Sequence, residues 1–324
     1  MEDLDLITVI ICTYNSDWNK VERTINSVLG QTGVNIELIV ADDGSNENFF
    51  EIIRKKIEKE SITYQLITSE NNQGTCKNLY NAIKHAKGRY VKDLGAGDCF
   101  YSCNSLAKWL QYMKKMKSKA SFGQAVYYNH NEVNDEIRII ERMHHPCLMG
   151  IYYQGTSYKA NQKQAYLILD DFPEGVSYFA EKEVLEKYLE QLIDKVIYGE
   201  DNVYRLMVAD GIQIDFYDEK LIWYDYGEGI STSKGHEWDA ILFKDMQSAT
   251  RMILEEMNRD FFYYRYKFIV RFFERRTLIN DFARWGLFPK TLIWTIKRKM
   301  QPFFTITDDV DTSFLKCYIE EKIE

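Results

Sequence analysis

Three short stretches combine carboxylates with small or polar residues, and each could handle a phosphate, a sugar or a proton. They are "ADDGSN", with Asp42 and Asp43, "GAGDCF", with Asp98, and "YGEDNVYRL", with Glu200 and Asp201. Carboxylates hold hard divalent cations such as Mg²⁺ or Mn²⁺, and a carboxylate of suitable pKa can remove a proton. The question for each stretch is whether it does such chemistry or only ends a structural element.

The stretch "VKDLGAGDCF" places Gly95, Ala96 and Gly97 before Asp98. One interpretation is a tight turn in which glycine supplies a positive φ. The other is that a diphosphate approaches the backbone here, neutralised by a cation that Asp98 holds. A divalent cation takes few protein ligands and completes its shell with phosphate and water, so one Asp could anchor it.

The other two acidic stretches also allow a structural interpretation. Asp42 and Asp43 end a predicted strand, so their side chains should point in different directions, one towards a ligand and one capping a turn or helix. Glu200 and Asp201 lie in the first turn of a predicted helix, where the helix dipole favours acids. Alternatively, one of this pair is a general base whose pKa its neighbour raises.

The first hundred residues alternate the patterns of buried strands and amphipathic helices. Strands are predicted at "LITVIICTYN", "IELIVADDGS", "ITYQLITS" and "RYVKDLG", and helices at "NKVERTINSVLGQ", "ENFFEIIRKKIEKE" and "GTCKNLYNAIKHAKG". This alternation predicts a parallel sheet with right-handed crossovers. Ligands bind at the carboxyl ends of the strands in such sheets, where "CTYN", "ADDGS" and "GAGD" are expected.

The pattern becomes mixed beyond residue 120. Further strands are predicted at "SFGQAVYYN", "NEVNDEIRIIER" and "IQIDFYDEKLIWYDY", and helices at "KEVLEKYLEQLID" and from "GEDNVYRLMVADG". The chain is expected to be helical from residue 239 to about 300, before a short acidic tail. We therefore expect one α/β domain over 1–238, in two parts (1–100 and 101–238), and a helical region over 239–324.

Composition and charge indicate a folded protein of the cytoplasm. The 324 residues are 45% hydrophobic and 28% charged, and no apolar run approaches the ~18 residues that a membrane span needs. The N-terminus is acidic, unlike a signal peptide. The six cysteines are scattered and are expected to be reduced thiols. A zinc site from Cys99 and Cys103 with His144 and His145 does not fit the usual ligand spacing.

The N-terminal half resembles glycosyltransferase family 2, inverting enzymes with the nucleotide-binding GT-A fold. The matching segments, in the family's order and spacing, are "TVIICTYN", "SVLGQT", "IELIVADDGS", "NNQGTCKNLYNAIKHAKGRYV" and "GAGD". A weaker match continues through "GEDNVYRLMVADG" and "YDYGEGIST" to about residue 235. The resemblance implies an α/β protein with a Rossmann-like, mostly parallel sheet flanked by helices, here with a C-terminal helical extension. It also implies that 1–238 is the catalytic domain, with a nucleotide-sugar-binding half (1–100) and an acceptor-binding half (101–238).

The same resemblance implies a nucleotide site at the first two strand ends. Thr13, Tyr14 and Asn15 would edge this site, with Tyr14 against the base. Asp43 would hydrogen-bond the base, usually uracil, and Asp42 would support the loop.

It also implies the residues that act on the sugar and the diphosphate. Asp98 matches the last acid of the family's DxD metal motif, although Ala96 and Gly97 stand just before it; Gly97 is expected to lie against the diphosphate. A Mn²⁺ or Mg²⁺ ion held by Asp98 would act as a Lewis acid on the leaving diphosphate. Asp201, beside Glu200, matches the catalytic base.

The implied reaction moves one sugar from a nucleotide-diphosphate sugar, with UDP expected, to an acceptor hydroxyl, and it inverts the anomeric configuration. The "QxxRW" element of processive synthases is absent, which favours single transfer over polymerisation. Such a reaction suits the assembly of surface polysaccharides or glycoconjugates, on a saccharide or lipid-linked saccharide acceptor.

The C-terminal region is basic and aromatic. Residues 251–300 carry 12 Lys and Arg against 5 Asp and Glu, whereas the whole chain has a net charge of −8. Basic aromatic helices bind anionic membrane surfaces, which would place the protein on the inner face of the cell membrane. Alternatively, the aromatic side chains pack on the catalytic domain. No nucleic-acid-binding module is recognisable.

Two other functions remain open at this point. A nucleotidyltransferase would share the sheet, but "CTYNSDWNK" lacks the glycine-rich basic loop expected after its first strand. A non-catalytic partner subunit with the same fold is suggested by the reduced DxD motif. The joint presence of Asp43, Asp98 and Asp201 favours an enzyme.

Overall fold

The computed structural model describes residues 5–60, 62–132, 134–140, 142–143, 146, 149–152, 158–227, 236–271, 278–300, 304–305 and 310–320. The strands are β1 (Leu6–Thr13), β2 (Asn35–Asp42), β3 (Thr63–Thr68), β4 (Tyr90–Gly95), β5 (Cys99–Phe100), β6 (Ala120–Asn131), β7 (Glu136–Ile140), β8 (Arg142–Met143), β9 (Tyr178–Glu181), β10 (Ile214–Asp225) and β11 (Phe304–Thr305). The helices are α1 (Trp18–Leu29), α2 (Phe50–Ile57), α3 (Thr75–His85), α4 (Ser105–Met116), α5 (Tyr158–Gln164), α6 (Lys182–Leu192), α7 (Asn202–Ala209), α8 (His236–Glu256), α9 (Phe261–Val270), α10 (Leu278–Leu287), α11 (Pro289–Met300) and α12 (Ser313–Glu320).

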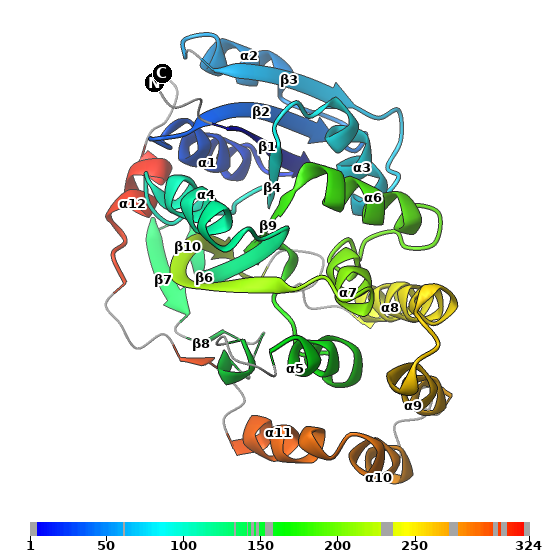
Figure 1. Cartoon of the computed structure of the whole chain (residues 1–324). Helices are drawn as coiled ribbons and strands as arrows, with labels where there is room; N and C mark the ends of the chain where they lie inside the picture. The colour runs from blue at the N-terminus through cyan, green and yellow to red at the C-terminus, as the bar shows by residue number, and fades with distance from the viewer. Residues whose placement is uncertain are drawn as a thin grey trace.

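A mixed sheet of nine strands forms the centre of the molecule (Figure 1). Its order is β3-β2-β1-β4-β9-β6-β10-β5, and β7 pairs with β6. β1 to β4 pair in parallel, as the alternating sequence predicts. β9 is antiparallel to both β4 and β6, so β6 runs parallel to β4. The carboxyl ends of β1, β2, β4, β6 and β10 therefore share one edge of the sheet, hereafter the carboxyl edge.

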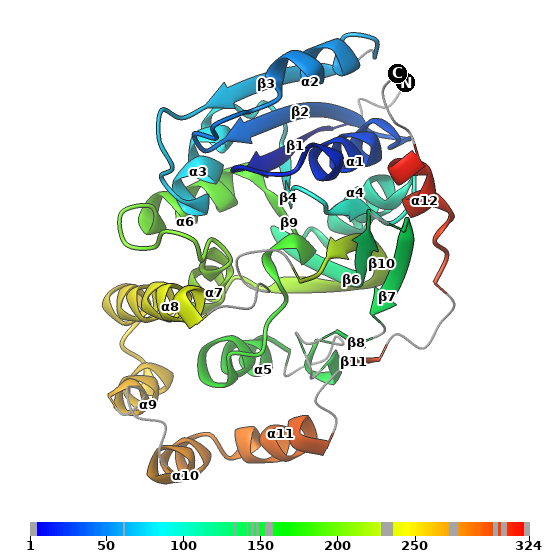
Figure 2. The same ribbon diagram turned by 180° about the vertical axis from the view of Figure 1, so that it is seen from behind.

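Helices cover both faces of the sheet, so its central strands are apolar on both sides. Alternate residues of β1 enter two different cores: Ile10 packs with α3, and Val9 and Ile11 pack with α1. The α3 face also carries buried side chains of α6, α7, α8 and α9. The α1 face carries those of α2, α4 and α12. The arrangement confirms the predicted GT-A-like sheet between helical layers (Figure 2).

The helices after residue 238 are present as predicted, but part of this region belongs to the central core. Buried side chains of α8 and α9, including Ala249, Ile253 and Tyr266, pack in the same core as the sheet. α12 lies in the tail, for which the sequence analysis predicted no element, and Leu315 and Tyr318 pack beside α1. The expected boundary at residue 238 therefore does not coincide with a break in packing.

A close contact joins the long parallel strands β6 and β10. A Cβ added at Gly123 would lie 2.4 Å from Cδ1 and 3.0 Å from Cγ of Leu221, which is fully buried. Real side chains do not approach so closely, so the glycine allows the two strands to pack. β10 in turn carries Asp225 to the carboxyl edge.

We expect Gly123→Ala to lower the free energy of unfolding by about 1–3 kcal/mol, because the added methyl group overpacks this contact. Equilibrium urea unfolding measures the effect. The control is Gly150→Ala, since an added Cβ there meets nothing within 4 Å. Equal stability of Gly123→Ala and the control would contradict the packing described.

Candidate active site

The loops after β1 and β2 are fastened to each other at the carboxyl edge. The backbone N–H of Asn15 donates to Oγ of Ser45 at 2.7 Å, and Oδ1 of Asn15 accepts the N–H of Asn46 at 3.0 Å. Asn15 has φ +46°, a backbone conformation that asparagine tolerates better than most residues. Tyr14 beside it is 48% exposed. The two loops thus leave the ring of Tyr14 exposed at the place where the nucleotide base was expected to bind.

Asp42 supports this pair of loops. Its Oδ1 accepts hydrogen bonds from the hydroxyls of Thr13 and Ser45, and its Oδ2 accepts from the N–H of Ser45 at 2.9 Å and the hydroxyl of Thr68 at 3.1 Å. The carboxylate thereby ties the ends of β1 and β3 to its own loop. This arrangement agrees with the supporting role that was expected of Asp42.

Asp43 points to the opposite face of the sheet and holds the start of α3. Its Oδ1 accepts the N–H of Gln73 at 3.0 Å, and its Oδ2 accepts the N–H of Gly74 at 2.8 Å. The side chain is only 3% exposed, and burial raises the pKa of its carboxyl group against the effect of these bonds. Asp43 is therefore a structural anchor in this structure, and contact with a nucleotide base remains a prediction.

Carboxylates of the protein lie beside the glycines of the "GAGD" loop. A Cβ at Gly97, where φ is +102°, would lie 2.5 Å from Oδ2 of Asp225. A Cβ at Gly95 would lie 3.0 Å from Oδ2 of Asp98. The positive φ of Gly97 agrees with the turn interpretation. The approach of a diphosphate to Gly97 stays a prediction.

Asp98 fastens this loop to β10. Its Oδ2 accepts the N–H of Gly95 and its Oδ1 accepts the N–H of Asp225, both at 3.1 Å. Asp225 forms ion pairs with Lys20 at 2.7 Å and Arg23 at 3.5 Å, both on α1. Asp98 therefore lies on the α1 side of the loop, whereas Asp43 lies on the α3 side of the sheet. That both carboxylates contact one nucleotide sugar stays a prediction.

The residues present at this loop do not fit the metal centre that was expected at Asp98. Its carboxylate is 7% exposed, and each oxygen already accepts a backbone N–H. Gly95, Ala96 and Gly97 offer no side-chain ligand. In the described part of the chain, no group of three or more His, Cys, Asp or Glu side chains could hold a metal ion. The loop is built as a structural junction.

The acidic pair Glu200 and Asp201 lies on the α3 face, immediately before α7. Asp201 occupies the N-cap position of α7, but its side chain makes no capping hydrogen bond. Gly175 borders the pair, since a Cβ there would lie 3.0 Å from Oε1 of Glu200 and 3.7 Å from Cβ of Asp201. Asp201 therefore does not cap α7, and its carboxyl group instead interacts with the backbone of Asn202 and with the charge of Arg205.

The surroundings of the pair favour proton transfer. Burial raises the pKa of Asp201 to about 6, with the Arg205 guanidinium acting in the opposite direction. Burial, followed by the charges of Asp201 and Asp93, raises the pKa of Glu200 well above its usual value. A carboxylate of pKa near 6 is largely ionised at neutral pH and is still basic enough to accept a proton. The role of Asp201 as a general base stays a prediction.

Sequence analysis did not single out several residues that shape the site. The charge of Asp93 on β4 acts on Glu200. The guanidinium of Arg205 on α7 donates hydrogen bonds to Oδ1 of Asn202 at 2.9 Å and to Oγ1 of Thr250 at 3.2 Å. Asp245 on α8 contacts the segment before Glu200. The sequence carried one sign of Asp245. It lies four residues before Ala249 and eight before Ile253, so a carboxylate occupies the buried face of α8, where an apolar residue would be usual. His144 and His145 of the zinc alternative, and residues 228–232 of "YDYGEGIST", lie outside the described residues.

The sequence of the chain is similar to those of known glycosyltransferases. The family model described as "Glycosyl transferase family 2" matches residues 8–189. Two Escherichia coli proteins named UDP-Glc:alpha-D-GlcNAc-diphosphoundecaprenol beta-1,3-glucosyltransferase, WfgD and WfaP, are 30% and 32% identical over 128 and 127 residues. These matches cover 40% and 39% of this chain and 49% and 47% of theirs, so the chain matches about half the length of these relatives.

A solved structure shares the fold over a longer stretch. Staphylococcus aureus TarS, residues 1–349 in complex with UDP-GlcNAc, superposes with a TM-score of 0.54 at 16% identity. The match covers 87% of this chain and 79% of that one. The likeness supports the GT-A architecture beyond residue 189, where the family model ends and where Glu200 and Asp201 lie.

The burial of Asp98 predicts a distinctive pH dependence of stability, because its effect on the pKa outweighs that of the two backbone hydrogen bonds, which favour the ionised form. Burial raises its pKa to about 7 in the folded protein, against about 3.9 in an unfolded chain. The stability that comes from its protonated form is complete below the lower value and is lost as pH rises through the higher one. Relative to Asp98→Asn, the wild-type free energy of unfolding should therefore decrease from pH 4 to pH 7.

Urea unfolding across this pH range measures the difference. Asp194→Asn, at a side chain that is 82% exposed, is the control, and its unfolding curves should parallel those of the wild type. A wild-type advantage that grows with pH would show that Asp98 is stabilised as a carboxylate, and would contradict the prediction.

Proposed function

We propose that this chain, which belongs to glycosyl transferase family 2, transfers a single sugar from a UDP-sugar to a hydroxyl of a lipid-linked saccharide and inverts the anomeric configuration. The observation that carries the proposal is the Glu200 and Asp201 pair, held near the carboxyl edge and not used for capping. The names of the two E. coli relatives, which act on a diphosphoundecaprenol acceptor with UDP-Glc, support the substrate classes.

The donor nucleotide would bind over the loops after β1 and β2. The exposed ring of Tyr14 offers a face on which a base can stack, and stacking is sequence-tolerant and worth about 1–3 kcal/mol. Thr13 and Asn15 are fixed by hydrogen bonds to Asp42 and to the loop after β2. A platform of this kind is preorganised, so little ordering of the protein accompanies binding.

The chemical step would be a single displacement. Asp201 accepts the proton of the acceptor hydroxyl as the oxygen attacks the anomeric carbon, and the bond from that carbon to the diphosphate oxygen breaks on the opposite side. Charge develops on the sugar through an oxocarbenium-like state, as in other glycosyl transfers. Burial, followed by the charges of Asp201 and Asp93, raises the pKa of Glu200 and so disfavours a second negative charge beside Asp201. The nucleoside diphosphate leaves with its electron pair.

The proposal includes no metal ion held by Asp98, because the residues of the "GAGD" loop do not fit one. Asp98, Asp225, Lys20 and Arg23 would instead give that loop a fixed shape beside the donor.

Family membership disfavours the nucleotidyltransferase alternative. The non-catalytic subunit alternative requires that the conserved fold persist without a working base. A buried acid with a pKa of about 6 that caps nothing favours the enzyme instead.

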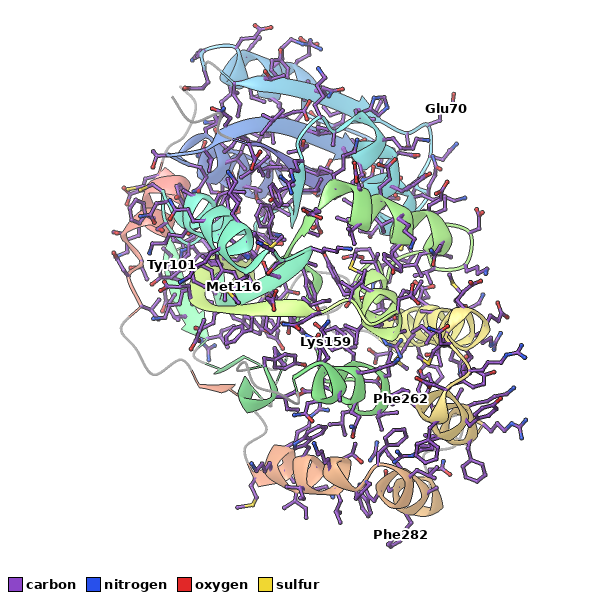
Figure 3. All side chains as sticks on the ribbon, in the orientation of Figure 1. Glu70, Tyr101, Met116, Lys159, Phe262 and Phe282 are labelled. Atoms are coloured by element: carbon purple, nitrogen blue, oxygen red, sulfur yellow. The ribbon has the colours of Figure 1, made fainter. Side chains whose placement is uncertain are left out.

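A membrane surface is the proposed place of the reaction. Exposed apolar side chains follow one side of α9, at Phe261, Tyr264 and Phe268, while Tyr263, Tyr266 and Ile269 are buried in the core. The ring of Phe282, 66% exposed, projects outward from α10 (Figure 3). Such side chains, together with exposed lysines of α9 and α11, suit an anionic lipid surface.

The same exposed apolar character continues on α11, at Leu292, Ile293, Ile296 and Met300. In the part of the chain that the structure describes, no helix is both long enough and apolar enough to cross a bilayer. One side of α9 packs inward on the core, as the packing interpretation expects, and the other side is exposed, as the proposed membrane contact requires.

The role of Asp201 predicts the effect of a single substitution. Asp201→Asn should lower the rate of sugar transfer by about 10²–10⁴-fold, because the base is lost, while the shape of the site is kept. Wild-type turnover should fall as pH decreases through about 6, where Asp201 becomes protonated. Transfer from UDP-sugars to a diphosphoundecaprenol-linked saccharide measures both effects.

Thermal stabilisation by UDP-sugars separates binding from chemistry in this experiment. Asp201→Asn should retain the wild-type shift, and Asp194→Asn should retain both the shift and the turnover. Full turnover in Asp201→Asn would show that Asp201 is not the catalytic base. The absence of any shift or transfer by wild type across the common UDP-sugars would remove the proposed function.

The exposed apolar side chains predict membrane binding in a flotation assay. Wild type should float with vesicles containing phosphatidylglycerol, and the combined substitutions Phe261→Ser, Phe268→Ser and Ile293→Ser should reduce its recovery severalfold, because inserted apolar area is lost. Ile52→Ser, at a 39% exposed residue of α2, is the control and should float like wild type. Equal recovery of the triple variant and wild type would eliminate the membrane proposal.

A further inference from the structure

A carboxylate of the C-terminal region accepts hydrogen bonds from residues 197–199, the segment that directly precedes Glu200 and Asp201. Asp245 of α8 is 2% exposed. Its Oδ2 accepts backbone N–H groups of Ile197, Tyr198 and Gly199, at 3.1, 2.7 and 3.1 Å. Gly199 directly precedes Glu200 in the chain. One oxygen atom of α8 thus fixes three consecutive peptide groups next to the proposed base.

This arrangement needs a negative charge at residue 245. A buried carboxylate is costly unless hydrogen-bond donors surround it, and hydrogen bonds to an ionised acceptor are shorter and about twice as strong as neutral ones. Three N–H groups can converge on one oxygen only if their backbone curls around it. The segment 197–199 therefore takes its shape from the anion, and loss of the charge would leave three buried donors without an acceptor of equal strength.

The same segment is held from the other side by α3. The N–H of Cys76 donates to the carbonyl of Ile197 at 3.0 Å. Gly74, with φ +89°, allows this approach, since a Cβ there would lie 2.4 Å from Cγ2 of Ile197. Gly74 is in turn held by Asp43. A continuous set of contacts thus runs from β2 through Gly74 and Ile197 to α8.

We propose that Asp245 is a positioning residue that sets the location of Glu200 and Asp201, so that α8 is part of the catalytic apparatus. The inference rests on the proposed function, because it assigns a purpose to the placement of the proposed base. α8 lies outside the residues that the family model matches. The helices after residue 238 therefore contribute to the reaction as well as to the core.

Asp245 also acts on the pair through its charge, together with the other groups around it. The charged and titratable side chains facing Glu200 or Asp201 are Asp93, Glu174, Arg205 and Asp245, with the thiols of Cys12 and Cys76 and the phenols of Tyr166, Tyr178 and Tyr204. The negative charge of Asp245 raises the pKa of both carboxyl groups, after burial and nearer neighbours. Its removal should lower both pKa values.

The substitution Asp245→Asn tests the proposal because the amide keeps the size of the side chain and removes the charge. We expect kcat for sugar transfer to fall by about 10²-fold, the effect of a base displaced by about 1 Å, with KM for the UDP-sugar unchanged. The acid limb of the pH profile of kcat should move to lower pH. A residue that supported only the fold would not move this limb.

The matched control is Glu255→Gln, which removes an exposed carboxylate from the same helix. It should leave both kcat and the pH profile as in wild type. Wild-type kcat and an unshifted pH profile in Asp245→Asn would overturn the proposal. An inactive wild type with the same UDP-sugars would instead reject the proposed function.

Amide hydrogen exchange on the wild-type protein gives a second measurement that does not depend on the folding of a variant. The N–H groups of Ile197, Tyr198 and Gly199 should be protected to a similar degree as those of the α7 core, because Asp245 accepts all three. Rapid exchange at these amides in the native protein would show that the carboxylate does not hold the segment, and would overturn the inference.

Discussion

The site depends on one recurring interaction, a buried carboxylate that accepts hydrogen bonds from the backbone of a neighbouring loop. Asp43 holds Gln73 and Gly74, Asp98 holds Gly95 and the backbone of Asp225, and Asp245 holds residues 197–199. An unpaired buried carboxylate would be very unfavourable, whereas one that satisfies backbone donors removes two penalties at once. Each loop at the carboxyl edge is consequently fixed by an element from a different part of the chain.

This use of carboxylates separates the acids of the site into two groups. Asp43, Asp98 and Asp245 each bind the backbone N–H groups of another loop. Asp201 differs, because its backbone interactions are local, with Asn202 and its own residue, because it makes no capping bond to α7, and because burial raises its pKa to about 6. Asp43, Asp98 and Asp245 thus hold loops in place, and Glu200 and Asp201 are the pair to which we assign proton transfer. That division is the physical basis for assigning the base to Asp201.

Much of the fold follows from sequence pattern, because local periodicity and burial determine it. The apolar runs of β1 and β2 and the amphipathic repeats of α1 and α3 predict the parallel half correctly. The short strands β5 and β9 could not be recognised, since they contain few residues and are defined by their partners. α4 and α12 carry ordinary helical periodicity, and the sequence analysis did not use it.

The site was predictable only in part, for a different reason. The positions of Asp42, Asp43, Asp98 and Asp201 at strand and helix ends follow from the order of elements. The side of the sheet to which Asp98 turns, and the filling of the space at Gly97 by Asp225, depend on residues 127 positions apart in the chain. The contact of Asp245 with residues 197–199 likewise spans more than one element. Such contacts exist only after folding.

The most direct test of this division of the acids is a calorimetric titration of UDP into the wild-type protein, once with EDTA and once with Mn²⁺. If Asp98 serves the backbone, UDP should bind in both solutions with closely similar affinity, and Asp98→Asn should not change the ratio of the two. Binding that is at least about tenfold tighter with Mn²⁺ in wild type, equivalent to about 1.4 kcal/mol, and that loses this gain in Asp98→Asn would contradict the structural role.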